Sequence, residues 1–338
     1  MKTRITMSVA GVLLAGWSGV AVAQQTLAPH TFEVTKASGQ VSIMSADNKT
    51  ETVKPGSVYD IGATKEVDPA ARLNPAAETE KTAPDITGFK VLAMDGLVDI
   101  KSPKGKTFAV AKLDTPYKLG STVKTGRSSF ADLELSPKNQ VRVLAKSEVQ
   151  VGMNIKHPLI ISLKLQQGKV DSKLDNFPKD HLFQVQTPVG ICGAVGTAYT
   201  VNQEMGDHSS LTTISVSDGV VVLDGRFVRT IGAGLSAGQS LEITVEEKEK
   251  SRDVTVTFSG KPGDTITVEV WGRQFTLTVP PAVEGQPAVV NASVSLRMNR
   301  DELGPNLDID IIDPAVGSLQ RYTIPSLDPR IDESPAGL

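Results

Sequence analysis

Cysteine and histidine are scarce in this chain of 338 residues, which has one cysteine and four histidines. Because Cys192 has no second cysteine to pair with, an intrachain disulfide framework is excluded. His30, His157, His181 and His208 show no paired metal spacing such as H-E-x-x-H, so we expect no zinc site. The fold must therefore be stabilised by its own apolar core.

Aromatic residues make up only 4% of the chain, and the formal net charge is −3. Few large rings are left for stacking on bases or sugars once a hydrophobic core has been filled. From the mild acidity we expect no cluster of basic residues and no nucleic-acid partner. We also expect no cofactor, since Gly190-x-x-Gly193-x-x-Gly196 precedes no helix that could hold a phosphate.

Long hydrophobic runs are missing except at the start. Lys2 and Arg4 precede an apolar stretch from Val9 to Val22, and Ala21-Val22-Ala23 fits a signal-peptidase site. The apolar run is shorter than the ~20 residues of a spanning helix, although an uncleaved membrane anchor is the alternative. We therefore predict a signal peptide at residues 1–23, no membrane span in the mature chain, and a periplasmic or extracellular location.

Period-2 alternation of apolar and polar residues dominates the rest. Ala131, Leu133 and Leu135 alternate with acidic residues, and the same pattern recurs up to residue 299. Asp218-Gly219 between two such runs predicts a hairpin. Because no long amphipathic helix occurs between residues 25 and 300, we predict an all-β protein of short antiparallel strands.

Two segments of the chain resemble each other. KASGQVSI around Gly39 aligns with AMDGLVDI around Gly96, at an offset of 57 residues, and VYDIG aligns with PYKLG downstream at an offset of 58. We interpret this as an internal duplication of a β-hairpin plus a following strand, with chance similarity as the alternative. Residues 63–87, rich in Ala, Pro, Glu and Thr, predict a flexible linker between the copies.

The C-terminal part predicts a smaller β unit and a tail. The charge run of residues 246–253 predicts a solvated turn or linker before three or four short strands. Beyond residue 300 the chain is rich in Asp and Pro without a sustained pattern, so we expect an irregular acidic tail. Asp308, Asp310 and Asp313 are oxygen ligands that calcium could use, but their spacing lacks the glycine and terminal glutamate of an EF-hand loop.

The stretch Phe183–Val201, FQVQTPVGICGAVGTAYTV, is the most distinctive. A half-buried strand ends at Thr187-Pro188, three glycines follow, and a second strand carries Val195 and Tyr199 on one face. Glycines at this spacing let one backbone pass close to another. The residues of this signature and of two later turns are Thr187, Pro188, Gly190, Gly193, Gly196, Thr197, Gly219 and Gly238.

An ordered series of motifs around this stretch resembles the FecR-like domain family, named for a regulator of bacterial iron-citrate uptake. The series covers Phe89 to about Glu246. Its members are Leu119–Gly126 (LGSTVKTG), Ser128–Leu133 (SSFADL), Leu165–Val170 (LQQGKV), Thr187-Pro188, Val195-Gly196-Thr197, Val216–Val221 (VSDGVV) and Leu235–Gln239 (LSAGQ).

The resemblance implies the extracytoplasmic β module of that family and no more. The family often carries Val-Arg-Gly-Thr where this chain has Ala194-Val195-Gly196-Thr197, so a contact made by that arginine is in doubt. Only about seven residues precede the apolar run, so we expect no cytoplasmic segment that binds a sigma factor. We therefore expect a signal peptide (1–23), an N-terminal β hairpin unit (24–62), a linker (63–87), a FecR-like domain (88–246), a small β unit (252–299) and an irregular tail (300–338).

No set of residues converges on a reaction. Cys192 could be a nucleophile with His181 as its base, yet a lone cysteine in an apolar strand is usually a small core side chain. We therefore expect a non-enzymatic exported protein that binds a protein or an envelope polymer. The alternatives are an envelope sensor that works with a separate membrane relay, and an envelope hydrolase with an unrecognised carboxylate pair.

Overall fold

The computed structural model describes residues 31–45, 48–60, 62, 88–154, 159–175, 181–194, 197–225, 227–284, 289–299, 307–313 and 318–324. Within these ranges the chain forms strands, turns and bends and no helix, which confirms the all-β prediction. None of the described residues belongs to a helix that could cross a membrane. The predicted signal peptide and the predicted linker lie outside the described ranges.

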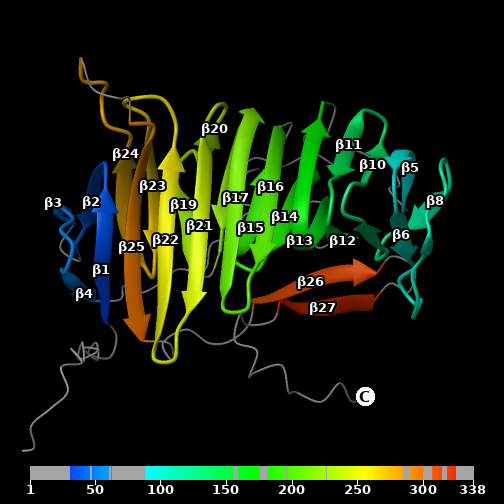
Figure 1. The fold of residues 1–338 in the computed structure, drawn as a ribbon, viewed down its shortest axis with the longest axis horizontal. Helices are drawn as coiled ribbons and strands as arrows, with labels where there is room; N and C mark the ends of the chain where they lie inside the picture. Colours follow the sequence, from blue (N-terminus) through cyan, green and yellow to red (C-terminus); the bar gives the residue numbers. More distant parts are fainter. Residues whose placement is uncertain are drawn as a thin grey trace, which may run out of the picture.

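The strands form two facing layers, which we call sheet A and sheet B (Figure 1). Neighbouring strands of sheet A are antiparallel throughout. Its order is β8 (Pro116–Lys118), β5 (Gly88–Asp95), β10 (Phe130–Ser136), β11 (Asn139–Val143), β13 (Leu159–Leu174), β16 (Ala198–Met205), β17 (Ser209–Asp218), β21 (Ser240–Glu247), β22 (Ser251–Ser259), β25 (Asn291–Asn299), β1 (Thr31–Ser38) and β4 (Val58–Asp60).

Sheet B lies behind sheet A and contains one parallel pair, β13 with β14. The short strand β20 (Leu235–Ser236) pairs with β18 beside β19. The order of sheet B is β7 (Ala109–Val110), β6 (Val98–Lys101), β9 (Thr122–Thr125), β12 (Glu148–Asn154), β13, β14 (His181–Thr187), β15 (Gly190–Ala194), β18 (Val220–Asp224), β19 (Val228–Ile231), β23 (Thr265–Val270), β24 (Arg273–Thr278), β2 (Gln40–Met44) and β3 (Thr50–Thr52).

One long strand, β13, belongs to both layers. Its first half pairs with β12 and β14 in sheet B, and its second half pairs with β11 and β16 in sheet A. The change of layer occurs at Gly168, whose φ of +99° is open only to glycine at low cost. A Cβ at Gly168 would lie 2.4 Å from the Cα of Ser147, so glycine is also required by space.

The core lies between the two layers, because alternate residues of each strand point inward. Val141 and Val143 of β11 and Leu163 and Val185 of sheet B are all 0% exposed, as are most inward residues. Each large apolar side chain buried in this way stabilises the folded state by about 1.5–3 kcal/mol relative to the same side chain left exposed to water. This core therefore stabilises the fold without an intrachain disulfide.

The two segments that resemble each other have the same arrangement at opposite ends of the molecule (Figure 1). In one end unit β1 lies in sheet A, β2 and β3 in sheet B, and β4 returns to pair with β1. In the other, β5 lies in sheet A, β6 and β7 in sheet B, and β8 returns to pair with β5. Each unit therefore forms one end of both sheets.

Matched contacts stabilise the two end units. Phe32 stacks on Tyr59 at 5.7 Å between ring centroids, and Phe89 stacks on Tyr117 at 5.6 Å. The corner glycines Gly39 and Gly96 have φ of +74° and +71°. The offset of 57–58 residues thus relates residues with the same neighbours. The domain limits drawn from the sequence stay predictions, and sheet A continues through them without a break.

The glycine turns at Gly39, Gly96 and Gly219 are corners between layers rather than hairpins, which corrects the hairpin predictions. The strands β1 and β2, β5 and β6, and β17 and β18 do not pair with each other. Both flanking strands carry an inward apolar face, so passing from one layer to the other buries both faces at once. Alternation alone does not distinguish this corner from a hairpin.

Part of the C-terminal tail is regular, which corrects the prediction of an irregular tail. Strand β26 (Leu307–Asp313) pairs antiparallel with β27 (Ser318–Ile324), and β26 meets β12 at Met153. The alternation in L-D-I-D-I is short and lies between two prolines, so the sequence pattern alone does not predict a strand there. Asp308, Asp310 and Asp313 consequently lie on a strand and not in a loop.

The end units should be essential to stability. Phe32→Ala and Phe89→Ala each remove a ring that is 0% or 2% exposed, so we expect a loss of about 3–5 kcal/mol in the free energy of unfolding. Phe32 also contacts Trp271 and Phe275, and its loss should be the larger. Urea denaturation followed by tryptophan fluorescence measures both, and a loss below about 1 kcal/mol in either variant would contradict a packed end unit.

Candidate functional site

The signature begins at the turn that joins β14 to β15. Thr187 is 0% exposed, and its Oγ1 donates a hydrogen bond to the carbonyl of Gly190 at 3.2 Å. Pro188 occupies this turn, where it interrupts no ladder hydrogen bond. The turn is thus fixed by its own side chains and offers no free polar group of Thr187.

The glycines of the signature allow close approach of backbones. A Cβ at Gly190 would lie 2.5 Å from the Cα of Gly225, and Gly193 is buried opposite Val222 of β18. Thr197, 1% exposed, donates through Oγ1 to the carbonyl of Val220 at 3.3 Å. These residues join sheet B to the start of β16.

The remaining signature residues also lie in turns. Gly219 has φ of +78° at the corner between β17 and β18, and Gly238 has φ of +82° before β21. The Gly238 amide donates to the Val216 carbonyl at 2.8 Å. Gly196 lies outside the described residues. The signature residues that the structure describes therefore shape the fold.

Sequence reasoning missed one strand in this stretch. Residues Gly190–Ala194 form β15 between β14 and β18, where the sequence predicts only a glycine-rich crossover. The segment GICGA has a single β-branched residue, so its propensity gave no strand signal. Its pairing is imposed by the strands on either side.

Cys192 lies in the core and not in a cleft. The side chain is 0% exposed, between Val185 and Leu223 in the register of sheet B. Burial raises the pKa of the Cys192 thiol far above its usual value, so the thiolate is strongly disfavoured. Burial likewise raises the pKa of Tyr199, whose hydroxyl donates to the Cys192 carbonyl at 3.4 Å.

The outer face of sheet A is a partly exposed array of hydroxyl and charged side chains. Along one row across the strands, Thr213, Glu242, Thr257 and Ser293 are cross-strand neighbours. They alternate with inward residues such as Val256, which is 0% exposed. We call this surface the A face; its outward residues on β17, β21, β22, β25 and β1 are Leu211, Thr213, Ser215, Glu242, Thr244, Glu246, Asp253, Thr255, Thr257, Ser293, Ser295, Arg297, Glu33 and Thr35.

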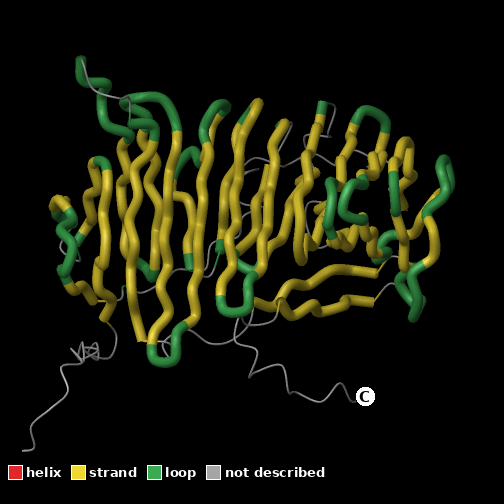
Figure 2. The backbone as a smooth tube through the Cα atoms, viewed as in Figure 1, coloured by secondary structure: helices red, strands yellow, loops and turns green. Residues whose placement is uncertain are grey.

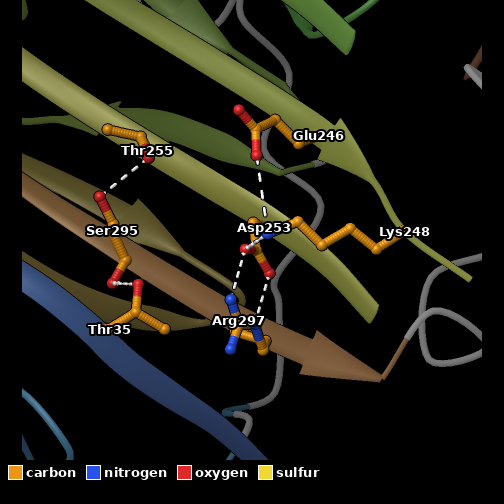
Figure 3. A network of polar contacts seen from close by, with 7 residues as sticks. All are labelled: Thr35, Glu246, Lys248, Asp253, Thr255, Ser295 and Arg297. Atoms are coloured by element: carbon orange, nitrogen blue, oxygen red, sulfur yellow. Dashed lines mark hydrogen bonds and ion pairs between the residues drawn. The ribbon is translucent and has the colours of Figure 1, made fainter. Parts of the chain in front are cut away.

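A polar network spans four strands of the A face (Figure 3). The Arg297 guanidinium donates two hydrogen bonds of 2.8 Å to the Asp253 carboxylate, and Lys248 donates to the same carboxylate. Thr255 Oγ1 lies 2.9 Å from Ser295 Oγ, and Thr35 Oγ1 donates to the Ser295 carbonyl at 3.1 Å. These contacts fix the positions of side chains that a partner could meet.

Asp253 is the acid whose environment is most altered on this face. Partial burial disfavours its charge, but hydrogen bonds and charge from Arg297 and Lys248 outweigh burial and hold the pKa of Asp253 below its usual value. The Arg297 pKa is raised in turn by its hydrogen bonds to Asp253. Asp253 is thus a stable anion and not a proton donor of the kind a glycoside hydrolase requires.

The outer face of sheet B differs, because its central polar residues are buried. Ser162 and Gln186 are 0% exposed, and Lys164 and Gln184 are 7% and 8% exposed. Gln184 donates to Ser162 Oγ at 2.7 Å, while the side-chain amide of Gln186 makes no hydrogen bond with any of the described residues. Burial lowers the pKa of Lys164. The centre of sheet B is therefore not an open surface.

Beyond the A face, one ion pair at the β21–β22 hairpin is sheltered. Arg252 and Glu247, each 3% exposed, are 2.5 Å apart at the β21–β22 hairpin. The Arg252 guanidinium lies over the Phe227 ring at 5.0 Å. This pairing corrects the prediction of a wholly solvated charge run at residues 246–253. Among the described residues, no group of three or more His, Cys, Asp or Glu could hold a metal ion.

Comparison with known protein families finds one matching segment of the chain. Residues 121–222 match the model of the FecR protein family, which confirms the resemblance for β9 to β18, including the signature. Two crystal structures of a proposed anti-sigma factor from Parabacteroides distasonis ATCC 8503, at 1.65 and 2.50 Å resolution, share 16% identity over 38% of this chain, with a TM-score of 0.31. The match spans 56% and 55% of those chains. No curated protein matches.

The signature glycines make a matched pair of tests. Gly190→Ala places a Cβ against the Gly225 backbone, so we expect loss of at least about 3 kcal/mol or failure to fold. Gly238→Ala meets no atom within 4 Å and should lose only the about 1–2 kcal/mol of a left-handed alanine. Chemical denaturation compares them, and equal losses would show that backbone approach at Gly190 is unimportant.

Asp253 should make stability depend on pH. Because its pKa is lowered on folding, its contribution is full above the unfolded pKa of about 3.9 and is lost as the pH falls through the folded pKa. We expect Asp253→Asn to lose about 1–3 kcal/mol at pH 7, and the gap to the wild type to close in acid. Urea melts at several pH values measure this.

The control is Asp132→Asn, which breaks a similar pair with Arg142 whose guanidinium side chain is 50% exposed. We expect a loss of at most about 1 kcal/mol there. A gap between Asp253→Asn and the wild type that widens in acid would contradict the assignment.

Proposed function

We propose that this protein is a non-enzymatic, exported FecR-like protein of the cell envelope that binds a protein partner through the A face. The observation that carries the proposal is the difference between the two outer faces. The A face is open and its side chains are held by a hydrogen-bonded network, whereas the central polar residues of sheet B are buried.

The size of the A face supports a protein partner over a single chain of an envelope polymer. Five strands from β17 to β1 span roughly 24 Å, and eight residues along each span roughly 26 Å, which together give roughly 620 Å². This falls at the lower end of the roughly 600–1,000 Å² that each partner contributes to a standard protein interface. A flat surface of this area matches a folded partner better than a thin strand.

The charge of the A face suggests the chemistry of the partner. Glu33, Glu242, Glu246 and Asp253 provide four carboxylates, against the cations Arg297 and Lys248. A partner with a mildly basic surface rich in hydrogen-bond donors is complementary to this pattern. The hydroxyl groups between the charges can donate or accept a hydrogen bond, so they can pair with either a donor or an acceptor of the partner.

The absence of enzymatic activity is part of the proposal. It is supported by the burial of Cys192 and by the lowered pKa of Asp253, since both are the reverse of what a nucleophile or an acid catalyst needs. Export rests on the predicted signal peptide at residues 1–23.

A sensor is the second candidate, favoured by the FecR family match at residues 121–222. In that role the β module would receive a signal and pass it to a separate membrane protein. Identification of the partner separates the two candidates, because a sensor requires a partner with a membrane-spanning segment, and a scaffold does not.

The experiment is an interaction assay with two A-face variants. Thr213→Arg and Thr257→Arg add bulky charge at outward positions of β17 and β22, one residue from the fully buried Ile214 and Val256. We expect the purified protein to retain a specific partner from envelope extracts, and the double variant to bind that purified partner at least tenfold more weakly, about 1.4 kcal/mol.

Gln140→Arg is the control, because it adds the same charge on β11, outside the A face, at an exposed position. It should leave binding unchanged. If no partner binds, or if the double variant binds as well as the wild type, the A face is not the binding surface. Hydrolysis of envelope polysaccharide by the purified protein would instead support the enzyme alternative.

A further inference from the structure

A pocket of about 390 Å³ opens at a row of corners where the chain passes between the layers. It lies beside the Gly126–Ser129 turn, the Lys146-Ser147 turn and the kink of β13. The volume falls within the 300–1,000 Å³ typical of small-molecule sites. Its lining is formed by Lys124, Thr125, Arg127, Lys146, Ser147, Glu148 and Gln167.

The floor of the pocket is rigid. The Lys146 amide donates to the Gly126 carbonyl at 2.9 Å, and the Thr125 amide donates to the Ser147 carbonyl at 3.0 Å. Ser147 Oγ accepts from the Lys169 amide at 2.9 Å, and Thr125 Oγ1 accepts from the Ser147 amide at 3.0 Å. The two turns are therefore held together before any ligand arrives.

The cations of the lining are only partly neutralised. Lys124 Nζ lies 3.3 Å from a Glu148 carboxylate oxygen. Arg127 and Lys146 are exposed and have no ion-pair partner among the residues that the structure describes. Three cations and one carboxylate give the lining a net charge of +2.

The surrounding chain reinforces this charge. Residues 101–146 contain ten Lys and Arg but three Asp and Glu, a net charge of +7 in a chain whose total is −3. Lys101 and Lys124 both lie over the Phe108 ring, at 5.0 and 5.6 Å from its centroid. Lys101 therefore lies near the pocket residue Lys124, and an added cation there raises the local density of anions and speeds their association. The excess of Lys and Arg in residues 101–146 also corrects the expectation of a chain without basic clusters.

The backbone of Lys146 supplies an independent observation. Its φ is +56°, a left-handed conformation that is cheap for glycine and costly for lysine. Strained backbone occurs at ligand sites, although Lys138, which lies outside this pocket, has a similar left-handed φ of +69°. Glycine at this position would fit the turn better but would remove the charge.

We propose that this pocket binds the phosphate group of a small ligand. A phosphate monoester carries a charge of about −1.5 to −2 at pH 7, which matches the net charge of the lining. The planar guanidinium of Arg127 can donate two hydrogen bonds to phosphate oxygens, and Lys146 adds a point charge. The site is separate from the A face and goes beyond the proposed function.

The test is isothermal titration calorimetry of the purified full-length protein in a phosphate-free buffer at constant ionic strength. The probes are inorganic phosphate and glucose 1-phosphate, with cosedimentation on phosphatidic acid vesicles as a third arm. We expect saturable binding in at least one arm. The probe that binds with the highest affinity shows whether the site takes free phosphate, a phosphosugar or a lipid headgroup.

Arg127→Gln and Lys146→Gly should each weaken that binding roughly tenfold or more, since each removes a charged hydrogen-bond donor. Lys146→Gly should at the same time raise the melting temperature by roughly 2–4 °C, because the left-handed strain is relieved. Weaker binding in a more stable protein rules out misfolding as the cause.

Lys138→Gly is the matched control, because Lys138 is also exposed, also left-handed (φ +69°), and lies at the opposite end of β11. It should stabilise the protein without affecting binding. Absence of saturable binding in all three arms would overturn the proposal. So would binding that persists in the Arg127→Gln and Lys146→Gly double variant, or equal binding of the monoanion acetate.

Discussion

Burial of two facing apolar surfaces is the constraint on which the whole structure depends. Because the single cysteine excludes an intrachain disulfide, the largest stabilisation that offsets chain entropy is the core between sheet A and sheet B. The chain meets this requirement by passing repeatedly from one layer to the other, and Figure 2 shows the strands and the loops and turns that join them. Each passage needs a tight corner, and glycines such as Gly39, Gly96 and Gly168 supply it.

A stack of strands built in this way has two open ends, and open edges invite association with other chains. Both ends are occupied by units of the same design, β1 to β4 and β5 to β8. Their returning strands β4 and β8 have only three residues each, which limits the unpaired edge. The resemblance between the two segments in sequence therefore has a physical purpose, since one solution to the edge problem serves both ends.

The two proposed binding surfaces, the A face and the pocket, differ in shape and in charge. The A face combines area with ordered hydroxyl groups and charges, whereas the pocket lined by Lys124, Arg127 and Lys146 combines concavity with cations that are only partly neutralised. Cys192, the most reactive residue type in the chain, is withdrawn into the core. Both proposed binding surfaces are accordingly formed by outward strand residues and corners, while the described signature residues maintain the backbone that positions them.

The sequence by itself determined the all-β class, most strand positions and the FecR-like stretch, because the period of two and the turn glycines are local signals. Local signals also related the two end units by an offset of 57–58 residues. Only the tertiary structure decided that Gly219 is a corner, that GICGA is a strand, and that Lys124, Arg127 and Lys146 line one pocket. These features depend on which strands become neighbours, and neighbours are chosen by the burial of distant faces that no local pattern records.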